Sequence, residues 1–374
     1  MIQVWAHEKD TVLGVCRYVS VESLVDTSIY YEIEAQHPPK LSNLNFALCA
    51  TLFEAMRLGR GLHIHGPVSR RLLINLEEFQ AAQVSWFPKE LKVVDINVDK
   101  EIDDAPAAAP AIVAFSGGLD GCFSYYRHTR GLIKYPEKIG AIMMVHGFDI
   151  PVSNERAALV ARKSVEKILD HEDVNRVWIK TNLRECGILG KYKTYKMVAN
   201  SWVRTFGAGV ASCFHQFDSE YSAGIIASDY PYSALVFPHG RNPVTNPLLS
   251  SGAMRITYDG ASVTRVERVD TIKDWAQAVG NLRVCFKEPL GVNCCKCQKC
   301  IRTILEFWAC GLKAPKCFPT LPKRGDILDI SLPSADQRDY FVDLISKAQM
   351  GGVNGWWLKE AKKIVTEFNL KSNT

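Results

Sequence analysis

The sequence predicts an α/β fold: a three-layer domain with a parallel sheet, preceded by an α+β domain and followed by a helical tail. Three observations predict it. Strand and helix patterns alternate after residue 110, a glycine-rich turn joins the first of these strands to its helix, and four closely spaced cysteines follow. We expect the domains to cover residues 1–104, 105–315 and 316–374.

Composition describes an ordinary globular protein. The chain has 374 residues, of which 47% are hydrophobic and 23% charged, and its formal net charge is +5. No run of like charges favours nucleic acid as a partner. The N-terminus lacks a leader pattern, and no apolar stretch approaches the ~18 residues that a membrane span needs. We therefore expect a cytoplasmic protein with no membrane partner, in which clustered cysteines indicate a metal site.

The N-terminal domain is predicted from two periodicities. Alternating β-branched and aromatic residues indicate strands, and apolar residues at helical spacing indicate helices. The expected strands are Thr11–Val19, Ser28–Ala35, Leu62–His65 and Leu91–Val98, and the expected helices are Leu44–Leu58 and Ser69–Ala82. The acidic, Ala/Pro-rich residues 101–110 are expected to form a linker.

After residue 110 the sequence pattern alternates between strands and helices, which is typical of a parallel sheet with crossover helices. The expected strands are Ala111–Phe115, Ile139–His146, Arg176–Thr181 and Gly224–Ala227, and the expected helices are Leu119–Arg130, Ser153–Leu169 and Ser201–Phe217. The polar residues 228–251 are too long for a simple connection and predict a functional loop. In the tail, Ser334 and Gln337 are expected to form a capping box for a helix that ends near Met350.

The turn Ser116-Gly117-Gly118-Leu119-Asp120 connects the first buried strand to its helix. Glycines let a phosphate group approach the backbone, and the free N–H groups and dipole of the helix favour negative charge. No Gly-Lys-Ser/Thr follows, so this is not a Walker A loop. The turn predicts an anion site; the alternative is a tight connection without a ligand.

Four cysteines, Cys285, Cys294, Cys297 and Cys300, follow the pattern C-x8-C-x2-C-x2-C. Zinc prefers four tetrahedral ligands, and four thiolates leave no position for a catalytic water, so the pattern predicts a structural zinc site. We expect Cys285 to arrive from a strand and Cys295 to lie outside the ligand set. An iron–sulfur cluster and four unrelated core thiols are the alternatives.

The glycine-rich turn resembles the SGGxDS loop of the PP-loop ATP pyrophosphatase superfamily. With the cysteine motif, residues 111–305 resemble the 7-cyano-7-deazaguanine synthase family of the queuosine pathway. The resemblance implies an adenine nucleotide alpha hydrolase-like domain, with ATP and Mg²⁺ as cofactors beside Zn²⁺. It further implies that Ser116, Gly117, Gly118, Leu119, Asp120 and Gly121 hold the phosphates, and that Asp120 is a catalytic residue that helps to bind magnesium. Gly121 departs from the pattern because it stands where the family has serine, which puts turnover in question.

The implied enzyme is an ATP-dependent carbon–nitrogen ligase. It would adenylate a carboxylate such as 7-carboxy-7-deazaguanine, release pyrophosphate and pass the acyl group to ammonia or to a macromolecule, giving an amide or a nitrile. Synthase-like relatives occur in anti-phage defence systems, so the acceptor can be a protein. A nucleic-acid acceptor and a homodimer stay open.

Further candidate residues lie at strand ends and in loops, where the ligand crevice of a parallel sheet is found. We expect Val145 and His146 to contact ATP, and Lys191 and Lys193 to be catalytic residues that bind phosphate. The expected substrate-binding residues are Asp149, Asn182, Arg184, His239 and Arg241. For each, an ordinary turn or a solvated loop is the alternative. His215, within an apolar helix, is expected to be a core residue.

Two other functions stay open. A nucleotide-binding regulatory module without turnover is consistent with Gly121. A tRNA-modifying PP-loop enzyme that carries out thiolation would need a reactive cysteine, for which Cys122 and Cys186 are the nearest candidates. The N-terminal domain is expected to recruit the acceptor; the alternative is that it only adds packing and stability.

Overall fold

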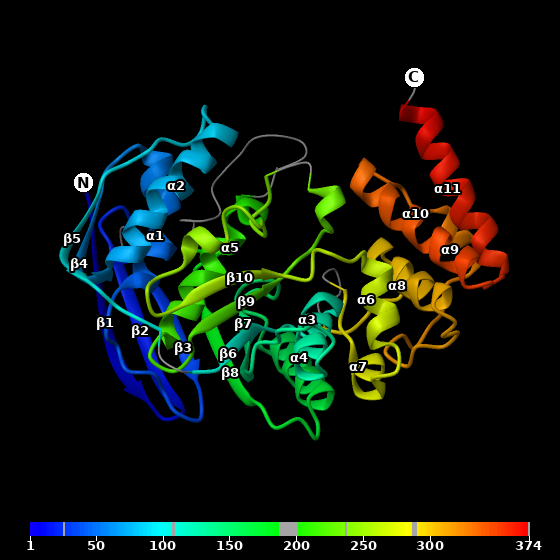
Figure 1. Ribbon diagram of the computed structural model, residues 1–374, viewed down its shortest axis with the longest axis horizontal. Coiled ribbons are helices and arrows are strands. Elements are labelled where there is room, and N and C mark those ends of the chain that lie inside the picture. Colours follow the sequence, from blue (N-terminus) through cyan, green and yellow to red (C-terminus); the bar gives the residue numbers. More distant parts are fainter. Residues whose placement is uncertain (25–26, 107–108, 187–200, 236–237, 286–289, 373–374) are drawn as a thin grey trace.

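The computed structural model describes residues 1–24, 27–106, 109–186, 201–235, 238–285 and 290–372. Within these residues ten strands form one mostly parallel sheet, in the order β10-β9-β6-β7-β8-β3-β2-β1-β4-β5 (Figure 1). The strands are β1 Ile2–Thr11, β2 Gly14–Val21, β3 Ile29–Glu34, β4 Leu62–Ser69, β5 Ile96–Ile102, β6 Ala111–Ala114, β7 Ile139–His146, β8 Asn175–Thr181, β9 Ala223–Ala227 and β10 Arg255–Asp259. The α/β class is therefore confirmed.

The helices pack on both sides of this sheet. They are α1 Asn45–Leu58, α2 Arg70–Trp86, α3 Leu119–Thr129, α4 Glu155–Ile168, α5 Ser201–Phe214, α6 Arg265–Ile272, α7 Ala276–Asn281, α8 Gln298–Ala309, α9 Arg324–Leu328, α10 Ala335–Met350 and α11 Trp356–Ser372. Short 3-10 turns are η1 His215–Phe217, η2 Tyr232–Ala234 and η3 Pro247–Leu249. None of the described helices has the length and apolar character required to cross a membrane.

In the parallel half of the sheet, the order in which the chain adds strands reverses at β6. The chain runs from β6 to β7 and β8 on one side, then returns past β6 to form β9 and β10 on the other. In open parallel sheets, ligands bind outside the carboxyl ends of the strands at such a reversal. The fold therefore predicts a ligand site at the carboxyl ends of β6 and β9.

Two hydrophobic cores lie on opposite faces of the sheet. On β7, Ala141 and Met143 join the core under α1, α2 and α5, whereas Ile142 and Met144 join the core formed with α3, α4 and α6 to α8. Alternate residues of a strand point to opposite faces, so a strand buried on both faces reads as a continuous apolar run. Beyond β8 the helices cover one face only, and the other face of β1, β4 and β5 is open to solvent.

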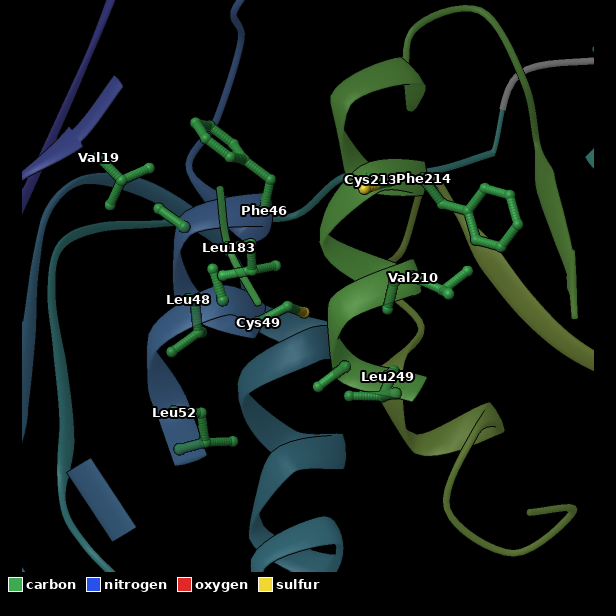
Figure 2. Close-up of a cluster of buried hydrophobic side chains, with 14 of the residues drawn as sticks. Val19, Phe46, Leu48, Cys49, Leu52, Leu183, Val210, Cys213, Phe214 and Leu249 are labelled. Carbon is green, nitrogen blue, oxygen red and sulfur yellow. The ribbon is translucent and has the colours of Figure 1, made fainter. Parts of the chain in front are cut away.

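The N-terminal strands continue the same sheet. β3 pairs antiparallel with β8, with Tyr31 opposite Thr181. Figure 2 shows α1 beside α5, and buried side chains of both helices, among them Cys49 and Val210, belong to one core. Residue 104 therefore lies in the connection between β5 and β6, two strands of one continuous sheet, and the division into 1–104, 105–315 and 316–374 stays a prediction.

Several local expectations are wrong. β1 and β10 were not expected, because both are short of apolar residues: only Ile2 and Val4 of β1 are fully buried, and β10 is an edge strand. β5 extends to Ile102, into the expected linker, since an edge strand can carry exposed charges. Ser334 makes no side-chain cap, because Gln337 instead bonds to α8.

Candidate functional site

The glycine-rich turn lies at the reversal point, between the end of β6 and the start of α3. Gly117 has φ +73°, a left-handed conformation that favours glycine, and Gly118 is the extended N-cap of α3. The first N–H groups of a helix lack intrahelical partners, and its dipole is positive at this end. The turn is therefore built to face an anion.

A cavity of about 220 Å³ opens in front of this turn. It is lined by Ser116, Gly118, Leu119, Asp120 and Gly121 of the turn and by residues that follow β7 and β9. The volume is below the ~300 to 1,000 Å³ common for pockets that enclose drug-sized ligands. It accommodates the phosphate end of a nucleotide or a small carboxylate rather than a whole nucleotide.

Charged side chains dominate the lining. The cations are Arg241, Arg265, Arg283 and Lys299, and the carboxylates are Asp120, Asp149 and Asp229. Four positive side chains outnumber three negative ones, and the positive end of the α3 dipole adds to the excess of positive charge. The cavity therefore favours an anion.

Asp120 is held by two arginines of α6. Arg268 Nη1 donates to Asp120 Oδ1 at 2.8 Å, and Arg265 Nη1 donates to the same oxygen at 3.2 Å. Burial alone would raise the pKa of Asp120, but Arg265 and Arg268 outweigh burial and lower that pKa to about 2. The carboxylate is ionised at neutral pH and joins α3 to α6.

Arg265 connects the cavity to the C-terminal helices. Its Nε lies 3.3 Å from Oε2 of Glu306, a carboxylate buried in α8 that also faces Arg302 at 3.6 Å. Arg302 lies over the ring of Tyr340 in α10, 4.0 Å from the ring centroid. The Tyr340 hydroxyl donates to the carbonyl of Asp229 at 3.4 Å. α10 therefore packs behind two cavity residues, Arg265 and Asp229.

His239 and Arg241, expected to bind substrate, both line the cavity together with Asp149. Arg241 pairs with Asp229 and lies over the ring of Phe206, 4.4 Å from the centroid. Burial lowers the pKa of His239, and its Nδ1 accepts the backbone N–H of Arg241 at 3.0 Å. The polar loop after β9 thus supplies residues to the wall of the cavity.

Other expected residues lie elsewhere in the described structure. His146 bonds through Nε2 to the carbonyl of Pro151 at 2.9 Å, and Asn182 joins β8 to β3 through the backbone of Tyr30. Arg184 donates to the carbonyl of Phe148. None of these three, nor Val145, is among the residues that line the described cavity. Lys191 and Lys193 lie outside the described residues.

Four charged cavity residues were not predicted from the sequence: Asp229, Arg265, Arg283 and Lys299. Asp229 follows the strand β9, so the rule that strand ends form the crevice could have found it. Arg265 and Arg268 stand three apart and share one face of α6, but the same spacing is typical of solvated helix surfaces. His215 is buried and bonds to the carbonyl of Leu249 at 2.8 Å, as expected of a core histidine.

The four cysteines converge. All four Sγ atoms lie within 4.8 Å of one another, with 3.9 Å between Cys285 and Cys297 and 3.9 Å between Cys294 and Cys300. Zn–S bonds of ~2.3 Å in a tetrahedron give S···S distances of about 3.8 Å. The Cys297 N–H also donates to Cys294 Sγ at 3.3 Å. The group could therefore hold zinc.

The surrounding contacts fix this group. Cys285 does not belong to a strand; instead its N–H and that of Val284 donate to Asn293 Oδ1, at 3.2 and 2.9 Å. These two N–H groups are therefore not available for pairing with a strand, and the segment that holds Cys285 lies outside the sheet. Cys295 has φ +58° and its thiol bonds to the carbonyl of Asn293 at 3.5 Å, away from the four ligands.

The cysteine group adjoins the cavity. Cys285 and Lys299, which stands between Cys297 and Cys300, both line it. The N–H of Arg283 donates to the carbonyl of Gly117 at 2.8 Å. A metal held by the cysteines would therefore fix one wall of the cavity and the glycine-rich turn.

Comparisons of the chain with protein-family models, with curated proteins and with solved structures find no match. Function must therefore be argued from the cavity itself. Its three components are a helix N-terminus behind two glycines, an excess of cations and an adjoining tetrathiol group.

Proposed function

We propose that the protein is an ATP-dependent ligase that adenylates a carboxylate and transfers the acyl group to an amine. The observation that carries the proposal is the position of Gly117 and Gly118 at the reversal point of a parallel sheet, facing a cavity lined by four cations. The resemblance of residues 111–305 to 7-cyano-7-deazaguanine synthases supports 7-carboxy-7-deazaguanine or a similar deazapurine acid as the substrate.

The chain's own residues would bind and orient the phosphates. The N–H groups that begin α3 face the leaving pyrophosphate, and Arg241, Arg283 and Lys299 offset its charge. Donors fixed before the reaction stabilise developing charge without reorganising. A carboxylate oxygen attacks the α-phosphorus, and the bond to pyrophosphate breaks with its electron pair. The amine nitrogen then attacks the acyl carbon, AMP departs, and the nitrogen loses a proton.

Magnesium, when bound, would offset charge on the phosphate oxygens. Asp120 does not fit as its ligand, because two guanidinium groups already contact that carboxylate and would repel a divalent cation. Asp149 fits better: it lines the cavity, and among the described residues Arg241, Arg283 and Lys299 act on its carboxylate only electrostatically, without a direct ion pair. We therefore assign Asp120 the role of positioning Arg265 and Arg268.

The acceptor is ammonia or a macromolecule, and an anti-phage role in the cytoplasm is part of the proposal. The N-terminal strands would supply a docking surface for a protein acceptor. Because α1 and α5 share one core, removal of residues 1–104 would expose that core. Substitutions on the exposed face of β1, β4 and β5 are therefore the appropriate test of docking, with labelling of the acceptor as the readout.

The test of adenylation uses the full chain with ATP, Mg²⁺ and a panel of carboxylates that includes 7-carboxy-7-deazaguanine. We expect pyrophosphate and AMP in equal amounts, dependent on the acid. ADP and inorganic phosphate as products would reject the proposal. Gly117→Ala tests the loop, because its left-handed conformation strains any other residue by ~1 to 2 kcal/mol.

The alternative is a nucleotide-binding module without turnover. The engagement of Asp120 by two arginines favours it, because a loop carboxylate held in this way is not free for metal. Protection of the fold by ATP in a thermal melt, with no AMP formed over hours, would support that alternative. Thiolation of tRNA is less well supported. Burial raises the pKa of Cys122 well above its ordinary value, and the Cys186 thiol bonds to the Leu183 carbonyl.

A further inference from the structure

A second group of side chains that can ligate a metal lies on the open face of β4 and β5, at the end of the sheet opposite to β10. His63 and His65 are two apart on β4 and therefore point to the same face. β5 runs parallel to β4 with Asn97 opposite His63, which places Asp99 beside the two histidines. Among the described residues, this is the second group whose donor atoms all lie within 4.8 Å of one another.

The donor atoms converge on one carboxylate oxygen. His63 Nε2 lies 2.8 Å and His65 Nδ1 lies 3.4 Å from Asp99 Oδ1. Zinc bonds of ~2.0 to 2.1 Å in a tetrahedron give donor separations of about 3.3 Å. The His65 separation already matches. That of His63 needs an increase of about half an ångström, within the freedom of a half-exposed aspartate.

The histidine rings are held in place by stacking. Trp5 stacks on His65 with 4.7 Å between centroids and an angle of 5°, and His65 stacks on His63 at 4.4 Å and 14°. Ligands whose orientation is fixed beforehand bind a metal with less loss of conformational entropy. The stack therefore preorganises both imidazoles.

The bond from His65 to Gln3 sets the role of each ring nitrogen. Gln3 Oε1 lies 2.8 Å from His65 Nε2 and can only accept, so Nε2 carries the proton. Nδ1 is then the ring nitrogen that faces the Asp99 carboxylate. Metal-binding histidines commonly donate their other N–H to an oxygen in this way.

We propose that His63, His65 and Asp99 bind a divalent transition-metal ion of the Zn²⁺ or Ni²⁺ class. Two imidazoles and one carboxylate suit these ions better than Mg²⁺ or Ca²⁺, which prefer all-oxygen sites. Three protein ligands leave at least one position open, and the side chains are 28% to 49% exposed, so water or a ligand from a partner can complete the shell.

The test uses the full chain loaded with one equivalent of Zn²⁺, which the four cysteines bind first. Calorimetric titration with further Zn²⁺ should then show one additional ion per chain. Titration with Ni²⁺ should quench the fluorescence of Trp5, which stacks on His65. In His65→Ala and in Asp99→Asn we expect affinity for the second ion to fall about tenfold or more, since loss even of a supporting residue costs 10- to 100-fold.

His171→Ala is the matched control, because His171 is an exposed histidine beside Asp170 that follows α4 and is not part of β4 or β5. It should bind the second ion as the parent does. Circular dichroism of every variant checks the fold. The proposal would be overturned if the protein bound no ion beyond the first equivalent. It would also be overturned if His63→Ala and His65→Ala bound the second ion as tightly as the parent. Failure of adenylation would leave it unaffected.

Discussion

Replacement of Asp120 by asparagine tests the central feature of the cavity, the pairing of one carboxylate with two buried guanidinium groups. Asparagine keeps the shape and removes the charge. Arg265 keeps Glu306 and Thr303 as partners, and Arg268 keeps the oxygens of Ser228, so neither guanidinium is left without a contact. The variant should therefore fold.

The cost follows from the pKa. Arg265 and Arg268 lower the pKa of Asp120 from 3.8 to about 2, against the opposing effect of burial. One pKa unit corresponds to ~1.4 kcal/mol, so the charged carboxylate stabilises the folded state by about 2 kcal/mol at neutral pH. A lowered pKa contributes stability above the ordinary value, and this contribution is lost as the pH falls through the folded-state value. At pH 3 roughly half should remain.

Urea unfolding of the parent and Asp120→Asn at pH 7 and pH 3 measures this difference. Asp339→Asn, which breaks a half-exposed pair with Arg338, is the control and should cost less than ~1 kcal/mol at both pH values. A difference for Asp120→Asn below about 0.5 kcal/mol at pH 7, or one that does not decrease at pH 3, would refute the pairing. If ATP binding in Asp120→Asn no longer responds to Mg²⁺, the carboxylate is a metal ligand and not a positioning residue.

Three further predictions concern residues in or behind the walls of the cavity. Cys297→Ser should lose the zinc found by elemental analysis and lower the melting temperature, because binding energy of ~10 kcal/mol or more can be coupled to folding at such sites; a variant of parental stability without metal would contradict this. Gly121→Ser places a β-carbon 3.3 Å from the carbonyl of Ala114, so we expect a loss of ~1 kcal/mol or more in urea unfolding and weaker pyrophosphate binding by calorimetry, with no change as the contrary result. Tyr340→Ala should cost ~3 kcal/mol, by the scale of buried aromatic deletions, and should weaken pyrophosphate binding several-fold because Arg302 and Asp229 lose a contact, whereas exposed Val342→Ala should do neither.

The parts of the fold that could be predicted are those in which local pattern and burial agree. β7 and α4 were expected within a few residues, because a strand buried on both faces and a helix with one apolar face have distinct periods. β1 and β10 could not be found in this way: β10 is an edge strand, which need not alternate, and β1, which lies between β2 and β4, is buried only at Ile2 and Val4. The continuity of the sheet at β3 and β8 depends on pairing between residues about 150 apart, which no local pattern encodes.

The same distinction explains the candidate site. The glycine turn and the cysteines are contiguous motifs, and the structure brings them to adjoining walls of one cavity. Arg265 and Lys299 lie far along the chain from Asp120, and each stands in a helix whose sequence reads as an ordinary charged surface. Their burial becomes visible only when α6 packs against α3 and α8 packs against α6. Because those helices also contact α10, the shape of the cavity depends on the C-terminal residues as much as on the glycine-rich turn.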